Sequence, residues 1–262
     1  MNLEIRGIGL WGPGLYSWND FLTSRNSDFD NLAESTPVPS AKSIPARERR
    51  RAPLPVKLAI ETIGQACAMA EVEPGTVATV FSSAMGDNEI TDYICRTLTG
   101  PQRFLSPTKF HNSVHNAPSG YWSIAAHNRA PSGYVGGFED SFPIGLLEAA
   151  TLCIAEKRPV ILAIYDVPTV APLNDICRIE DSFGAAFVID SYSHSNAWSI
   201  EIYCREGQST RPKMHSPVLQ NICERNPAAQ SLALLEAIAK GDPAVLCWPT
   251  GNATHLELSL KN

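Results

Sequence analysis

The stretch from Tyr134 to Tyr165 constrains the fold more than any other part of the sequence. A short strand is predicted around 134–137 and a turn at Glu139–Ser141, followed by an apolar helix over 143–156 and a strand over Val160–Tyr165. The second strand does not alternate between polar and apolar residues, which is typical of a strand buried on both faces. This order of strand, helix and buried strand indicates a crossover unit, so we predict an α/β fold.

Other elements follow from local patterns. Ser17 is a suitable N-cap for a helix, and two later segments carry the apolar spacing of helices that pack on a core. The segment 26–55 is rich in Ser, Pro, Asp and Ala and is predicted to run over the surface rather than through the core. The remaining predicted strands are 3–9, 77–81, 183–189, 199–203, 244–248 and 254–260, the predicted helices are 18–22, 56–70, 88–98, 119–127 and 227–240, and a loop is predicted from 99 to about 116.

Size and charge narrow the class of protein. A chain of 262 residues with 44% hydrophobic content can bury one sizeable α/β core or two small ones. The net charge of −6 is spread along the chain, which argues against general binding to nucleic acid or to a membrane surface. Met1–Gly9 carries acidic and basic residues where a signal peptide needs a long apolar run, and no window reaches the length of a membrane span. A cytoplasmic location is therefore expected.

The seven cysteines lie at wide intervals and form no C-x-x-C pair. This spacing argues against a disulfide framework and against a zinc site, and most of the cysteines are expected to be reduced core residues. No metal is expected.

His111 and His115 have the four-residue spacing that on a helix places two imidazoles on one zinc ion, with His127 as a third ligand. Prolines flank the pair, and no carboxylate lies between Asp92 and Glu139. Hydrogen-bonding roles in a loop or an interface are the favoured interpretation.

The segment Gly7–Gly12 matches the G-x-G-x-x-G pattern that binds a dinucleotide pyrophosphate when a helix follows it. Pro13 and Gly14 follow here, so no helix begins where the phosphate needs its amides. A strand that ends in a tight turn is the favoured interpretation.

One part of this acidic sequence carries an excess of positive charge. The interval from Tyr93 to Phe138 contains four basic residues and no carboxylate, and a second basic cluster lies nearby in the sequence. Such surfaces attract anionic partners, but they are also common as merely solvated faces, and both alternatives stay open. The second cluster comprises Arg47, Arg49, Arg50 and Arg51.

A set of ordered stretches carries a family resemblance. Ile5–Pro13 is a strand with a glycine turn, Ser106–Asn116 is a loop of the form Ser-Pro-x-x-F-x-N-S-V-H-N, and Phe183–Asp190 is a glycine- and alanine-containing strand. Together they resemble the N-terminal half of β-ketoacyl synthases over roughly the first 190 residues. The resemblance implies a thiolase-like fold in one structural domain, with residues 1–195 as a largely complete N-terminal half and 196–262 as a much shortened C-terminal half packing on it.

Two departures from that family bear on function. In the register of the resemblance, the position of the family's active-site cysteine falls on Glu139, and a carboxylate cannot serve as the thiolate that accepts an acyl chain. The family's H-G-T-G-T and N-x-x-G-x-G-G-H stretches, which supply two histidines, do not occur. The carboxylates of Glu139 and Asp140 also suit a helix start on purely structural grounds.

A shortened ketosynthase without the cysteine resembles the chain length factors of aryl polyene biosynthesis. That resemblance implies a non-catalytic subunit that forms a heterodimer with a catalytic ketosynthase and shapes the tunnel for the growing acyl or polyene chain during malonyl condensation on acyl carrier protein. No cofactor of its own is expected, because phosphopantetheine arrives on the carrier protein. Arg47, Arg49, Arg50 and Arg51 are the candidate contact with the carrier protein, with a merely solvated surface as the open alternative. The implied tunnel and interface residues are Phe110, His111, Asn112, Ser113, Val114, His115, Asn116, Tyr121 and Trp122.

Two other functions stay open from the sequence. One is an independent condensing or acyl-transfer enzyme that uses Glu139 or a cysteine such as Cys153. The other is a stand-alone module that binds acyl carrier protein.

Overall fold

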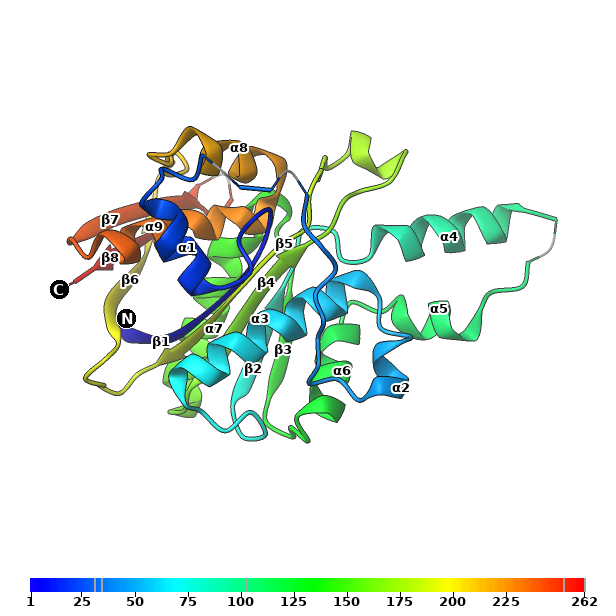
Figure 1. Ribbon diagram of the computed structural model, residues 1–262, viewed down its shortest axis with the longest axis horizontal. Coiled ribbons are helices and arrows are strands. Elements are labelled where there is room, and N and C mark those ends of the chain that lie inside the picture. Colours follow the sequence, from blue (N-terminus) through cyan, green and yellow to red (C-terminus); the bar gives the residue numbers. More distant parts are fainter. Residues whose placement is uncertain (31, 34, 102, 252, 262) are drawn as a thin grey trace.

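The computed structural model describes the whole chain except residues 31, 34, 102, 252 and 262. Its framework is an eight-stranded sheet in the order β3-β2-β4-β5-β1-β6-β8-β7 (Figure 1). The strands are β1 (Asn2–Trp11), β2 (Ala78–Ser82), β3 (Ser132–Val135), β4 (Val160–Asp166), β5 (Phe183–Asp190), β6 (Trp198–Glu206), β7 (Ala244–Pro249) and β8 (Thr254–Leu260).

The predicted crossover is confirmed. Strands β3 and β4 both pair with β2 in parallel, and α7 (Ser141–Glu156) connects β3 to β4 across it. From β4 onward the neighbouring strands of the sheet run antiparallel. Strand β4 is buried along its whole length, as its uninterrupted apolar sequence predicted. The chain therefore has a mixed α/β sheet whose parallel part lies at the β3 end.

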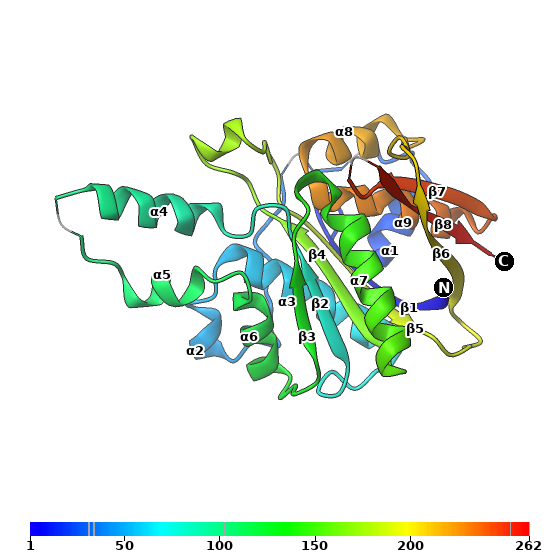
Figure 2. The same ribbon diagram turned by 180° about the vertical axis from the view of Figure 1, so that it is seen from behind.

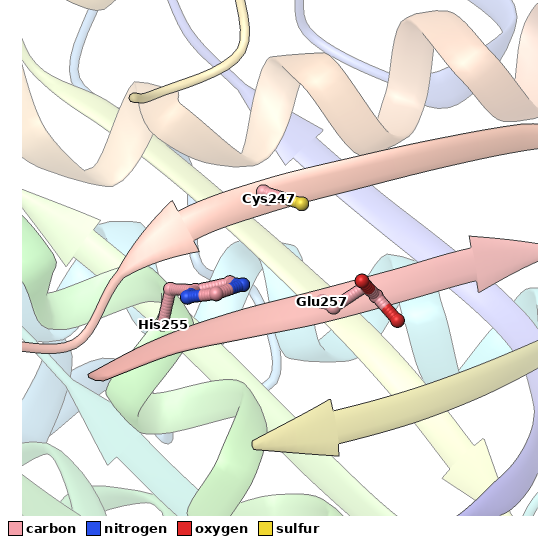
Figure 3. A group of neighbouring side chains, drawn as sticks. All are labelled: Cys247, His255 and Glu257. Carbon is pink, nitrogen blue, oxygen red and sulfur yellow. The ribbon is translucent and has the colours of Figure 1, made fainter. Parts of the chain in front are cut away.

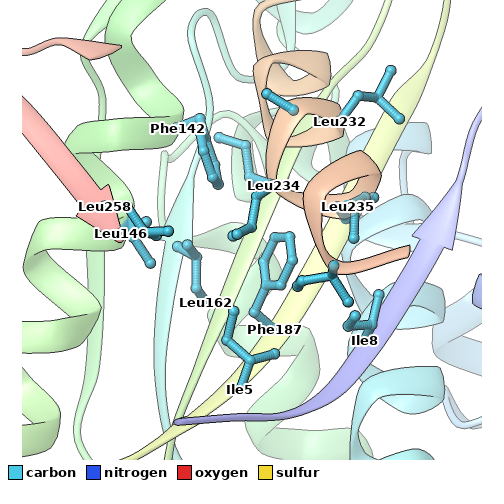
Figure 4. Packing of buried hydrophobic residues seen from close by; sticks show 14 of the residues in the cluster. Ile5, Ile8, Phe142, Leu146, Leu162, Phe187, Leu232, Leu234, Leu235 and Leu258 are labelled. Carbon is cyan, nitrogen blue, oxygen red and sulfur yellow. The ribbon is translucent and has the colours of Figure 1, made fainter. Parts of the chain in front are cut away.

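Helices cover both faces of the sheet (Figures 1 and 2). On one face, α3 (Leu54–Ala70) packs on β1, β4 and β5. On the other face, α7 and α9 (Leu232–Lys240) enclose an apolar core in which Phe142, Phe187 and Leu234 meet (Figure 4). Two separate clusters of buried side chains thus hold the sheet between its helices. The other helices are α1 (Trp18–Arg25), α2 (Ala46–Arg49), α4 (Asn88–Thr99), α5 (Pro107–Asn112), α6 (Ala117–Ala125) and α8 (Pro217–Arg225).

The glycines of the first strand have a packing role. A side chain at Gly7 or Gly9 would collide with the backbone of α3 at Ala66 or Thr62. After β1 a tight turn closes between Gly12 and Leu15, with Gly14 at a φ of +67°. The interpretation of this segment as a strand ending in a glycine turn is confirmed.

Several local predictions need correction. Phe29, Ala41 and Ile44 are buried, so the segment 26–55 contributes to the core although most of it lies at the surface. The predicted loop before 116 contains α5, which follows the N-cap Ser106 and has proline in its first turn. Helix α8 was not predicted, and the single helix expected over 227–240 is a 3₁₀ turn, Pro227–Ser231, followed by α9.

The last third of the chain continues the same sheet. Strand β6 pairs with β1, and β8 and β7 extend the sheet beyond it. The proposed division at residue 195 stays a prediction. In the part of the chain that the structure describes, no helix combines the length and the apolar content needed to cross a membrane.

Candidate functional site

The turn between β3 and α7 forms a sharp elbow at the carboxyl edge of the parallel strands. Phe138 has a left-handed φ of +50° and begins a 3₁₀ turn, Phe138–Asp140, that leads into the helix. The backbone N–H of Gly137 donates to Ser141 Oγ (3.0 Å), whose hydroxyl donates to the carbonyl of Phe138 (2.7 Å). A non-glycine residue in this conformation is strained, and such strain is found where a strand-to-helix turn presents a side chain to a site.

The elbow presents no thiol. Its left-handed residue is Phe138, and the residue after it is Glu139, where the sequence resemblance places the family's cysteine. Phe138 is 55% exposed, and the side chain of Glu139 is 71% exposed. Whichever of these two positions corresponds to the family's cysteine, the side chain there is an aromatic ring (Phe138) or a carboxylate (Glu139) and not a thiolate.

Arg211 holds both acidic residues of the elbow. Its guanidinium lies 3.2 Å from Glu139 and 2.6 Å from Asp140. Arg211 comes from the segment between β6 and α8, far from the elbow in sequence. The carboxylates are therefore engaged in an ion-pair cluster as well as lying at the start of α7, where the helix dipole favours negative charge.

A pocket of about 450 Å³ opens beside the elbow, lined by charged side chains and two thiols. Burial raises the pKa of Cys177 to about 11 and that of Cys223 to about 12, so both carry their proton at neutral pH. No histidine is found among the described residues that line this pocket. The pocket therefore lacks both a thiolate and an imidazole base. Its lining is Glu139, Cys177, Arg178, Arg211, Pro212, Lys213, Gln220, Cys223, Glu224, Pro227 and Gln230.

Cys153 is not a usable nucleophile in this structure. It is fully buried in α7 against β5, with its sulfur 3.7 Å from the carbonyl oxygen of Ile189. Burial raises the pKa of its thiol to about 11. A substrate cannot reach this group without disrupting the core, which argues against the alternative of an enzyme acting through Cys153.

A buried carboxyl group lies at the same carboxyl end of the parallel strands as the elbow. Asp166 ends β4, is 1% exposed, and accepts hydrogen bonds from Ser83 Oγ (2.7 Å) and the N–H of Ala84 (2.8 Å) on one oxygen. Its second oxygen has no partner among the described residues. Burial raises the pKa of this carboxyl to about 7, which outweighs the opposing effect of the hydrogen bonds. The sequence patterns gave no sign of this group, because its burial depends on how β2 and β4 pair.

Helices α4 and α5 project from the body of the molecule as an arm (Figures 1 and 2). Tyr93 joins them: its hydroxyl accepts a hydrogen bond from the N–H of Ser106 (3.1 Å), and Lys109 Nζ lies 4.0 Å from the centre of its ring. The arm and the residues just after it expose large apolar side chains, which water does not favour. These are Leu98 (48%), Phe104 (87%), Phe110 (63%) and Val114 (53%).

The structure divides the predicted tunnel and interface residues into two groups. Phe110, His111, Ser113, Val114, His115 and Asn116 are exposed. Asn112, Tyr121 and Trp122 are buried, and Tyr121 donates to Asn112 Oδ1 (3.1 Å), while Asn112 Nδ2 donates to the carbonyl of Arg51 (3.0 Å). Whether any of these residues lines a tunnel stays a prediction.

Among the residues that the structure describes, the three histidines considered as zinc ligands do not come together as a group that could share one metal ion. His111 and His127 are exposed, and the ring of His115 packs on Tyr134 with centroids 5.2 Å apart. The preference for a loop or interface role is consistent with these positions.

The basic cluster lies beside the arm. Arg47 and Arg49 are in α2, Arg50 follows it, and Arg51 is tied through its carbonyl to Asn112 at the end of α5. Arg47, Arg50 and Arg51 are exposed, and Arg49 is half-buried. The predicted carrier contact and the predicted interface loop are thus neighbours in space.

A family model matches most of the chain, and solved structures share its fold. The model of the β-ketoacyl synthase N-terminal domain matches residues 23–254. No curated protein matches the sequence.

Solved structures resemble the chain over nearly its whole length. A ketosynthase (ApeO) in complex with its chain length factor (ApeC) from Xenorhabdus doucetiae matches with a TM-score of 0.70 at 20% identity, covering 99% of each chain. The ishigamide ketosynthase/chain length factor matches with a TM-score of 0.71 at 12% identity, also covering 99% of each chain. AntDE:AntF, a type II acyl-carrier protein in complex with its ketosynthase bound to the hexaketide, matches with a TM-score of 0.73 at 10% identity and the same coverage. At these identities the likeness shows the fold, which is thiolase-like.

Proposed function

Because the chain belongs to the β-ketoacyl synthase N-terminal domain family, we propose that it is a non-catalytic chain-length-factor subunit that pairs with a catalytic ketosynthase. In that role it shapes the tunnel for the growing acyl or polyene chain during iterative malonyl condensation on acyl carrier protein. The pathway class is aryl polyene or related type II polyketide and fatty acid synthesis.

The observation that carries the proposal is the elbow between β3 and α7. Condensation needs a sulfur nucleophile to hold the acyl chain, and the elbow displays Phe138 and Glu139 instead. Glu139 is ion-paired to Arg211, and the neighbouring thiols of Cys177 and Cys223 hold their protons. A subunit built in this way depends on another chain for the chemical step.

Two surfaces support pairing with another chain. Strand β3 is at the edge of the sheet and pairs on one side only, so one row of its backbone N–H and C=O groups faces outward. The arm that carries Phe104 and Phe110, with Val114 just after it, begins after β2, the neighbour of that edge. An unpaired edge next to exposed apolar side chains has the character of a protein interface.

The exposed members of the predicted interface loop are the natural tunnel-facing residues. Phe110 and Val114 have apolar surface to offer a partner, whereas Tyr121 and Trp122 are committed to the core of this chain. We infer that Tyr121 affects the tunnel indirectly, because its hydroxyl donates to Asn112 and so fixes the end of α5. Bulk at Phe110 would then limit chain length, since each added two-carbon unit needs apolar volume.

The solved complexes support the proposal by analogy. Two of the matching structures are described as a ketosynthase with a chain length factor, and a third contains an acyl-carrier protein. In the proposed role, the basic cluster of Arg47, Arg49, Arg50 and Arg51 is the candidate contact for the carrier protein, and phosphopantetheine would arrive on that carrier.

The test uses the purified chain alone and mixed with a candidate catalytic ketosynthase partner. Each sample receives an acyl-loaded carrier protein and malonyl carrier protein, and products and intact protein masses are recorded. We expect no covalent acyl group on this chain under either condition. Elongation is expected only with the partner, with a product distribution that differs from that of the ketosynthase alone.

The open alternatives give different results in the same experiment. Elongation by the isolated chain that is lost in Glu139→Gln would identify an independent enzyme. Carrier binding without any effect on the partner's elongation would identify a binding module. Either result overturns the auxiliary role.

A further inference from the structure

Three side chains with metal-binding donors meet at the end of the sheet opposite the β3 edge. Figure 3 shows Cys247 on β7 and His255 and Glu257 on β8. Cys247 is paired directly with Glu257, and His255 lies two residues before Glu257 on the same strand. Residues with this register and this spacing share one face of a sheet. One donor atom from each side chain lies within 4.8 Å of the others.

The cluster faces away from the core. The alternate residues Trp248, Leu256 and Leu258 are buried beneath the sheet, whereas the three potential ligands are half-buried on its other face. The arrangement is therefore reachable from solvent, yet its side chains are partly shielded.

A hydrogen bond orients the imidazole. His255 Nδ1 lies 3.1 Å from the carbonyl oxygen of Gly207, which can only accept a hydrogen bond, so Nδ1 carries the proton. The lone pair is then on Nε2. Metal-ligating histidines in proteins are fixed in this manner, with the second ring nitrogen donating to a carbonyl or a carboxylate.

A neighbouring cation holds the carboxylate. Arg205 on β6 is paired with His255 in the ladder, and its Nη2 and Nε contact one oxygen of Glu257, at 3.0 and 3.3 Å. The other oxygen is not used by Arg205. The guanidinium positions Glu257 for a ligand, but its charge opposes the binding of a cation.

We propose that Cys247 Sγ, His255 Nε2 and one oxygen of Glu257 bind a Zn²⁺ ion. Thiolate, imidazole and carboxylate are the ligands of zinc, while Mg²⁺ and Ca²⁺ select oxygen alone. Tetrahedral zinc with bonds of about 2.0–2.3 Å holds its donors roughly 3.3–3.8 Å apart. The donor atoms here lie within 4.8 Å of one another, so side-chain rotations that shorten these distances by about 1.0–1.5 Å close the site. On binding, the thiol of Cys247 releases its proton to solvent, and water fills the fourth position.

The zinc site joins the edge strand β7 to β8 independently of the β3 end. In the sheet order, β7 is the last strand and β3 is the first. The inference therefore does not rest on the proposed function, and its test needs no partner protein and no carrier.

The experiment is a titration of the full chain with Co²⁺ and then Zn²⁺. We expect a 1:1 cobalt complex with thiolate-to-cobalt charge-transfer absorption in the near ultraviolet, which Zn²⁺ displaces. Cys247→Ser should remove that absorption, and His255→Gln and Glu257→Gln should each weaken zinc binding more than about tenfold. The matched control is Cys204→Ser, which removes an exposed thiol on the adjacent strand β6 and should change nothing.

A second variant tests the geometry without removing a ligand. Arg205→Gln takes away the cation beside Glu257 and should tighten zinc binding several-fold, with a larger rise in melting temperature when zinc is added. Absence of a thiolate–cobalt band in the unchanged chain would overturn the proposal. The same conclusion follows if the band persists in Cys247→Ser or disappears in Cys204→Ser.

Discussion

Arg211 lies 3.2 Å from Glu139, across a distance of more than seventy residues in the sequence. The same guanidinium contacts Asp140 at 2.6 Å, so the elbow between β3 and α7 is closed by charge pairing. A carboxylate held in this way is positioned by Arg211. The relationship gives Glu139 a structural use in the turn before α7.

The first prediction concerns Glu139. Glu139→Gln should leave elongation by the paired complex within about twofold, because in the proposed role the carboxylate takes no part in the chemistry. The ion pair is largely exposed, so the free energy of unfolding should fall by less than about 1 kcal/mol. Elongation rates and urea denaturation measure both quantities. A loss of more than about tenfold in elongation rate, with the fold intact, would contradict this view.

The second prediction concerns Asp166 and pH. Its pKa is about 7 in the folded protein and near the ordinary value of 3.8 when unfolded, so the folded state binds more protons between those values. Stability should therefore fall as pH rises from about 4 to about 7 and then level off, with up to about 4 kcal/mol lost from this group. Urea denaturation at pH 5 and pH 8 measures the change.

Asp166→Asn is the control for that pH dependence. The amide is similar in size and does not ionise, so this part of the pH dependence should disappear in the variant. An equal loss of stability between pH 5 and pH 8 in both proteins would assign the effect to other groups.

The third prediction concerns the projecting arm. Phe110→Asp places a charge on an exposed apolar side chain and should weaken binding to the catalytic ketosynthase more than about tenfold. Val245→Asp is the matched control, because Val245 is equally exposed, at 65% against 63%, but lies on β7 at the other end of the sheet. Analytical ultracentrifugation of the mixed subunits gives both affinities. If both variants weakened binding to the ketosynthase equally, the arm would be excluded as the interface.

The fourth prediction concerns product length. Phe110→Ala keeps an apolar surface but removes bulk, so the paired complex should make longer products while still assembling. Ile124→Ala, at an exposed position on α6, serves as the control. Mass spectrometry of the released chains reports the distribution. An unchanged distribution would leave pairing intact and exclude Phe110 as a tunnel wall.

The fifth prediction concerns Trp122. This side chain is 2% exposed and packs in the cluster beneath α3, so Trp122→Ala should cost about 3–5 kcal/mol of stability. The milder Tyr121→Phe removes one hydrogen bond to Asn112 and should cost about 1–2 kcal/mol. Chemical denaturation measures the loss of stability in each variant. A neutral Trp122→Ala would show that the ring is not part of the core.

Much of the fold was predictable because local spacing encodes it. The Ser17 cap, the helix over 56–70 and the buried strand Val160–Tyr165 follow from patterns a few residues long, and the structure has all three. Short elements such as α5 and α8 were missed, because a stretch of six to nine residues gives little periodicity. The burial of Ile44 was missed since nothing in its neighbours distinguishes it from a surface loop.

The sequence by itself determined the family, the crossover unit and the carboxylate in the turn before α7, because each is written in neighbouring residues. Only the tertiary structure decided that Phe138 takes the left-handed position, that Arg211 closes the elbow, and that Asp166 is buried. It also brought Cys247 opposite Glu257, through the pairing of β7 with β8. These relations depend on sheet register and on contacts between distant segments, and no short sequence pattern specifies either.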